Sequence, residues 1–125
     1  MTSSNPSNGV TRQDGVTIIA LGPEYENLDD AVLEELRQVI LDGVAQADPP
    51  LVVLDLSHTK FFGSAFIEVL FRAWNRIEKQ EGGEFCLCGL TPYCAEVIDV
   101  THLNRLWKIF NTRQEAVAEL KAKNA

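Results

Sequence analysis

The feature that most constrains the fold is the run of four apolar residues at positions 51–54, LVVL. Strands that face solvent on one side alternate apolar and polar residues, and this run has no alternation. It therefore predicts a strand buried on both faces, which is typical of a central strand with a parallel neighbour. Such a strand needs helices to cover its sheet, so the chain is expected to belong to the α/β class.

The segments around this strand predict an alternation of helices and strands. Apolar residues recur at helical spacing in residues 28–47 and again in residues 64–80. Asn27 is placed to cap the first of these helices, and the pair Asp14-Gly15 predicts a hairpin turn. The predicted elements in order are two strands within residues 10–21, a helix at 28–47, a strand at 51–57, a helix at 64–80, a strand at 84–90, a short helix from Thr91 and Pro92, a strand at 106–110, and a helix that the capping box of Thr112 and Glu115 opens and that ends at Lys123.

This order predicts one α/β domain with a mixed, mostly parallel sheet of about five strands and about four helices. The hairpin makes the sheet mixed, because its two strands run antiparallel. A length of 125 residues suits a single domain, which is expected over residues 10–125. Residues 1–9 are polar and are expected to form a disordered tail.

The charge balance argues against two classes of partner. The chain carries 11 basic and 18 acidic side chains, a net charge of −7 at pH 7. Nucleic-acid-binding domains usually present a basic face, and anionic membranes attract basic segments, so neither partner is expected. The N-terminal residues lack the features of a signal peptide, and no apolar run approaches the roughly 20 residues of a membrane span. A cytoplasmic protein is therefore expected.

The three cysteines, Cys86, Cys88 and Cys94, do not form a metal-binding pattern. A zinc site needs a fourth ligand at suitable spacing, and neither His58 nor His102 is placed to supply one. Free cysteine behaves as a small apolar residue, so we expect reduced, partly buried thiols and no metal or other cofactor.

Ser64 follows Gly63 at the predicted start of a helix, and three roles are open to it. As a nucleophile it would need the tight turn of the G-x-S-x-G motif, but Phe62 and Phe66 occupy the two glycine positions. Neither histidine of the chain lies in a motif that marks it as the base of a catalytic triad. A small serine hydrolase is thus a remote alternative, and no enzymatic activity is expected.

The second role for Ser64 is structural, and the third builds on it. Serine is a favoured N-cap residue, because its hydroxyl accepts a hydrogen bond from a free N–H of the first turn. The start of a helix also favours negative charge, so the fold would tolerate a phosphate on Ser64. That phosphate would add close to two negative charges to the surrounding surface. One serine could then change binding without changing the fold.

The residues around Ser64 follow a recognisable order. After the central strand come the D-L-S of Asp55, Leu56 and Ser57, the apolar pair Phe61 and Phe62, and then Ser64. This order resembles the central segment of STAS domains, the family of bacterial anti-sigma factor antagonists, in which the matching serine is phosphorylated. Gly22 and the closing segment FNTRQEAVAEL also match the family, so the likeness covers about residues 10 to 121.

Three positions beside Ser64 differ from the D-S-S-G pattern of the family. Gly63 stands in place of the aspartate, Ala65 in place of the second serine, and Phe66 in place of the glycine. A scaffold or adaptor with the same fold and no phosphorylation therefore remains as the alternative function.

The resemblance implies an anti-sigma factor antagonist in a partner-switching pathway. The unphosphorylated form would bind an anti-sigma factor with serine kinase activity and so release a sigma factor. Phosphate on Ser64 would end that binding. The protein itself is expected to be a monomer or a weak homo-oligomer. The residues expected to contact the partner are Gly22, Pro23, Glu24, Tyr25, Ser57, Thr59, Lys60, Gly63 and Ala65.

Overall fold

The elements of the fold follow the predicted order. The structure, a computed structural model, describes residues 9–22 and 30–124. Within these residues the elements are β1 (Val10–Gln13), β2 (Val16–Ala20), α1 (Asp30–Ala45), β3 (Leu51–Asp55), α2 (Ser64–Glu78), β4 (Glu84–Cys88), α3 (Pro92–Val100), the 3-10 turn η3 (Leu103–Arg105), β5 (Lys108–Phe110) and α4 (Arg113–Asn124). The predicted five-stranded mixed sheet with four helices is confirmed, and only η3 is added to it. The predicted cap Asn27 and residues 1–8 of the predicted tail lie outside the described residues.

The sheet has the strand order β1-β2-β3-β4-β5, which places β3 in the centre. β1 and β2 are antiparallel, and every other neighbouring pair is parallel. Asp14 and Gly15 form the turn of the hairpin with φ angles of 55° and 83°. Positive φ at both positions matches the right-handed twist of the two strands. The predictions of the hairpin and of the central parallel strand are both confirmed.

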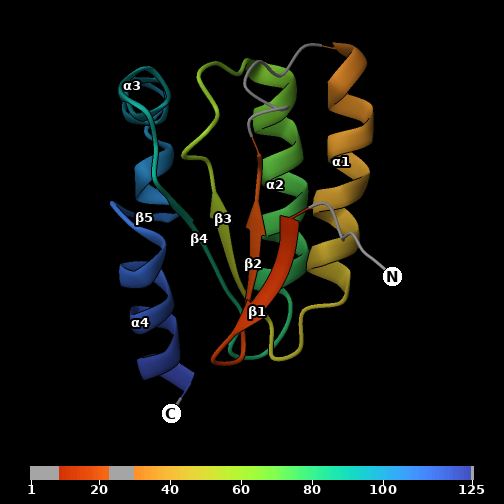
Figure 1. Ribbon diagram of the computed structural model, residues 1–125, viewed down its shortest axis with the longest axis vertical. Helices are drawn as coiled ribbons and strands as arrows, with labels where there is room; N and C mark the ends of the chain where they lie inside the picture. Colours follow the sequence, from red (N-terminus) through yellow and green to blue (C-terminus); the bar gives the residue numbers. More distant parts are fainter. Residues whose placement is uncertain (1–8, 23–29, 125) are drawn as a thin grey trace.

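β3 is buried on both faces because helices cover the sheet on each side (Figure 1). Val52 and Leu54 point into a core shared with α1 and α2. Leu51 and Val53 point into a second core, shared with α4. The two cores explain why the sequence of this strand has no polar position before Asp55.

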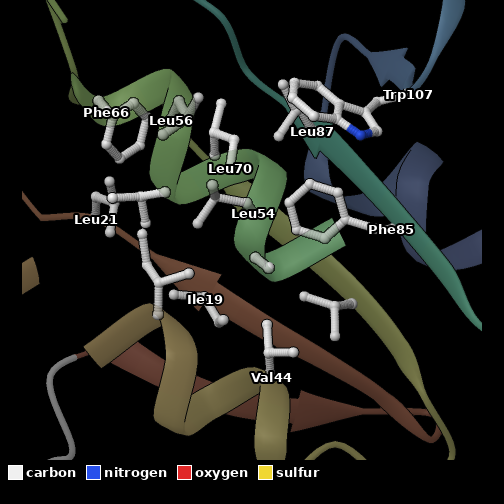
Figure 2. Close-up of a cluster of buried hydrophobic side chains, with 14 of the residues drawn as sticks. Ile19, Leu21, Val44, Leu54, Leu56, Phe66, Leu70, Phe85, Leu87 and Trp107 are labelled. Carbon is white, nitrogen blue, oxygen red and sulfur yellow. The ribbon is translucent and has the colours of Figure 1, made fainter. Parts of the chain in front are cut away.

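The larger core joins α2 to the sheet (Figure 2). Phe66, Leu70 and Ile77 of α2 are fully buried in it, as the predicted apolar stripe requires. Trp107 packs beside them, with its ring centroid 5.4 Å from that of Phe71 and 5.8 Å from that of the β4 residue Phe85. Full burial of a Phe, Leu or Ile side chain stabilises the fold by roughly 1.5–3 kcal/mol, so the buried stripe of α2 fixes the position of this helix on the sheet.

The smaller core lies between the sheet and α4. Cys86 and Cys88 of β4 face it, together with Val117 and Leu120 of α4. Both thiols are free and buried, and burial raises the pKa of each to about 12. In the described part of the chain, no group of three or more His, Cys, Asp and Glu side chains could hold a metal ion. No helix there is long and apolar enough to cross a membrane.

The starts of α3 and α4 follow the predicted capping residues. Thr112 and Glu115 form a reciprocal capping box: the Glu115 amide donates to Thr112 Oγ1 at 3.1 Å, and the Thr112 amide donates to Glu115 Oε1 at 3.3 Å. Thr91 is the N-cap residue of α3 and Pro92 follows it, but the Thr91 side chain makes no capping hydrogen bond. Its hydroxyl instead binds the loop between β3 and α2, which carries the candidate site.

Candidate functional site

Three loops meet at the carboxyl edge of the sheet. β3, β4 and β5 run parallel, so the segments that follow them emerge at the same edge. The segment after β3, residues 56–63, is called here the β3–α2 loop, and it leads into the start of α2 (Figure 1). α3 follows β4 and α4 follows β5, so both helices begin near this loop. Ligands and partners of open α/β sheets commonly bind at such an edge.

Ser64 is the first residue of α2 and not its cap. Gly63 occupies the N-cap position with φ −120° and ψ −164°, and no side chain caps the helix. The predicted capping role of Ser64 is therefore wrong by one residue, because the chain leaves its extended conformation at Gly63. Ser64 is exposed, and its side chain makes no hydrogen bond within the described residues.

This environment does not suit Ser64 as a nucleophile. A nucleophilic serine needs a base within hydrogen-bond reach of its hydroxyl. Among the described residues, neither His58 nor His102 donates to or accepts from Ser64. An exposed hydroxyl without an internal partner is instead accessible to another protein.

The β3–α2 loop is held in place by its own backbone. The Leu56 amide donates to the Cys88 carbonyl at 3.0 Å, which continues the pairing of β3 and β4. The Thr59 carbonyl accepts from Thr91 Oγ1 at 2.9 Å and from Cys94 Sγ at 3.4 Å. These two bonds fix the middle of the loop to the start of α3.

The structure contradicts the partner contact that was predicted for Thr59. Its side chain is fully buried, so it cannot touch a partner on the surface described here. Its hydroxyl also has no hydrogen-bond partner within the described residues. A polar residue in a loop normally indicates exposure, but the packing of α3 over the loop buries this one. Thr59 thus positions the loop through its carbonyl.

The carboxylate of Asp55 connects the β3–α2 loop to α4. Its Oδ1 accepts from the Ser57 amide at 3.0 Å and from Ser57 Oγ at 2.7 Å. Its Oδ2 accepts from Arg113 Nε at 3.1 Å and from Arg113 Nη2 at 2.9 Å. Ser57 is a local partner, two positions after Asp55, but nothing in the local sequence indicates Arg113.

These contacts also set the charge of Asp55. Its burial by itself raises the pKa of the carboxyl group, because water no longer solvates the ionised form. The hydrogen bonds from Ser57 and the charge of Arg113 act in the opposite direction and together outweigh burial, so the pKa of Asp55 lies below its ordinary value. Asp55 is thus an ionised anchor beneath the loop.

The other predicted contact residues fall into three groups. Lys60, Gly63 and Ala65 are exposed close to Ser64 in the sequence, and Ser57 is exposed beside Asp55. Gly22 is partly exposed directly after Leu21, whose amide donates to the Asp55 carbonyl at 3.2 Å and so places the end of β2 beside the end of β3. The remaining three, Pro23, Glu24 and Tyr25, lie outside the described residues.

Comparison with known proteins decides the family. Residues 9–116 match the family model of the STAS domain. The chain belongs to the STAS domain family. A solved anti-sigma-factor antagonist (STAS) domain protein from Planctomyces limnophilus is 38% identical, with a TM-score of 0.83 over 93% of this chain and 97% of that one.

Two further proteins are similar to this STAS domain, one in sequence and one in fold. The anti-sigma F factor antagonist of Paenibacillus polymyxa is 26% identical over 106 residues, which cover 85% of this chain and 87% of the relative. The Bacillus cell fate determinant SpoIIAA, solved in its phosphorylated form, is 18% identical and has a TM-score of 0.66 over 89% of this chain and 96% of its own. The predicted membership of the anti-sigma factor antagonist family is confirmed.

Proposed function

We propose that this STAS domain binds an anti-sigma factor that has serine kinase activity, and that phosphorylation of Ser64 ends the binding. The observation that carries the proposal is the environment of Ser64: an exposed hydroxyl at the first position of a long helix, with no hydrogen bond to any residue that the structure describes. The name of the Paenibacillus relative supports the class of partner. The phosphorylated state of SpoIIAA supports control of this fold by phosphate.

Phosphorylation at Ser64 would change the surface more than the fold. The kinase would transfer the γ-phosphoryl group of its ATP to Ser64 Oγ; the new O–P bond replaces the bond to ADP, and the hydroxyl proton is released. The phosphate would lie at the N-terminus of α2, where the helix dipole and the first-turn amides favour negative charge. A partner that contacts Gly63 or Ala65 would meet a bulky anion and dissociate.

In this proposal the STAS domain performs no catalysis itself. ATP and the phosphoryl-transfer machinery belong to the anti-sigma factor, and the domain contributes the acceptor hydroxyl and a docking surface. Its place of action is expected to be the cytoplasm, where sigma factors work.

The test is phosphate incorporation by purified anti-sigma factor kinases from the same organism. Each kinase is incubated with the STAS domain and ATP, and intact mass is recorded. We expect a gain of one phosphate in the wild type and in Ser57→Ala, and none in Ser64→Ala. A phosphate that persists in Ser64→Ala would refute this site. Binding without any phosphate gain would favour the adaptor function, with which Gly63 and Ala65 in place of the family residues agree.

A further inference from the structure

Two exposed aromatic rings lie against each other beside the start of α2. Phe61 of the β3–α2 loop is 48% exposed and Tyr93 of α3 is 50% exposed. Their ring centroids are 5.5 Å apart. The large exposed hydrophobic residues in the described part of the chain are these two together with Val100 and Leu106. Adjacent apolar side chains left in water commonly mark a protein-binding surface.

The pair is also held rigidly. The Thr59 carbonyl, two positions before Phe61, accepts hydrogen bonds from Thr91 and Cys94, which flank Tyr93 in the sequence. The loop and α3 are therefore fixed to each other at Thr59, next to the ring contact. Aromatic side chains have few rotatable bonds, so a partner that buries this pair would lose little conformational entropy on binding.

The surroundings of the pair indicate the chemistry of the partner. Ser64 comes shortly after Phe61 in the sequence. The small residues Gly63 and Ala65, on either side of Ser64, are exposed. Glu68 and Glu96 are exposed one helical turn after Ser64 and Tyr93. Lys60, the basic residue of the same loop, already has an interaction within the chain. The two exposed carboxylates, in a chain of net charge −7, favour a partner that offers an apolar hollow with basic residues at its rim.

We infer that Phe61 and Tyr93 form a single aromatic contact that inserts into an apolar hollow, rimmed by Lys or Arg, on the anti-sigma factor. The inference rests on the proposed function and adds α3 to the docking surface. It also explains how one phosphate could end binding, because a dianion on Ser64 would lie at the border of a contact that has to exclude water.

The test measures the affinity of the anti-sigma factor kinase that modifies Ser64 in the experiment above. Isothermal titration with a non-hydrolysable ATP analogue keeps Ser64 unmodified during the measurement. Phe61→Ala and Tyr93→Ala are each expected to raise Kd at least about tenfold, as for central aromatic residues of an interface. The double variant is expected to raise Kd by less than the product of the two single effects, because the rings contact each other.

Leu106→Ala is the matched control. Leu106 is 45% exposed on the segment between η3 and β5, away from the β3–α2 loop in the sequence, and its removal is expected to change Kd by less than about twofold. Thermal unfolding of all variants should stay close to the wild type, since each truncated side chain is about half exposed.

The outcomes separate the two proposals. If no anti-sigma factor kinase binds the wild type, the proposed function and this inference both fail. If the wild type binds and the Phe61 and Tyr93 variants bind equally well, the aromatic contact alone is refuted. A strong loss of thermal stability with unchanged Kd would likewise overturn the inference, because it would assign the two rings to the fold.

Discussion

Ser57 and Ser64 are both exposed on the segment that follows β3, but among the described residues only the hydroxyl of Ser57 has a hydrogen-bond partner. Ser57 Oγ donates to Asp55 Oδ1 at 2.7 Å, in a network that extends to Arg113. Ser64 Oγ makes no hydrogen bond within the described residues. The difference shows that exposure alone does not make a serine available for modification. A phosphate on Ser57 would face the ionised Asp55, whereas one on Ser64 would lie at a helix start.

The largest loss of stability is expected from removal of the Asp55 carboxylate, which accepts the hydrogen bonds of Ser57. Asp55→Ala leaves the Ser57 amide and the Arg113 guanidinium without their carboxylate. Breaking a fully buried ion pair typically costs about 3–5 kcal/mol, and the partial exposure of Arg113 lowers the expected loss here to about 2 kcal/mol. Urea denaturation measures it. Ser64→Ala serves as the control and should change the free energy of unfolding by less than about 0.5 kcal/mol.

A smaller change in the free energy of unfolding is expected when pH is varied. This change measures the contribution of the charge of Asp55. Because the folded-state pKa of Asp55 lies below its ordinary value, the ionised group stabilises the fold above the unfolded-state pKa of about 4. That stability is lost as pH falls through the lower folded-state pKa. The stability advantage of the wild type over Asp55→Asn should therefore shrink below about pH 4. A difference that stays constant across a pH series of urea denaturations would show that the charge contributes nothing.

The smallest change in stability is expected from a substitution of Ser64. Ser64→Asp places an acid in the first turn of α2, where the helix dipole favours it, so the free energy of unfolding should change by less than about 0.5 kcal/mol. Binding of the anti-sigma factor should nevertheless weaken, because the acid imitates part of the phosphate charge. Thermal unfolding and titration measure the two quantities. Ser57→Asp, the matched change next to Asp55, should destabilise the fold; equal stability of the two variants would remove the distinction between the serines.

The architecture could be predicted from the sequence because the features that determine it are formed by residues close together in the chain. The unbroken apolar run of β3 requires cover on both faces, and the Asp14-Gly15 pair supplies the two positive φ angles of the hairpin. Thr112 and Glu115 satisfy each other across one helical turn. Each of these features can be read from a few consecutive residues, so each was recoverable without coordinates.

The parts of the site that were missed depend on contacts between distant segments. Arg113 of α4 reaches Asp55 of β3 across a separation of 58 residues in the sequence, and no short pattern connects them. Thr59 has the composition of an exposed loop, but the start of α3 covers it. Ser64 was placed one residue too early relative to the helix, because a glycine can begin a helix without any side-chain bond.

The buried thiols of Cys86 and Cys88 have a consequence for chemical reactivity. Burial raises the pKa of both thiols far above neutral pH, so few molecules carry a thiolate on either residue, and thiolates are the species that peroxides and alkylating reagents attack. The folded domain is therefore insensitive to oxidants at these positions. Because α4 covers both thiols, we expect a maleimide to label them when α4 moves away from the sheet, and the labelling rate would then report how often that layer opens.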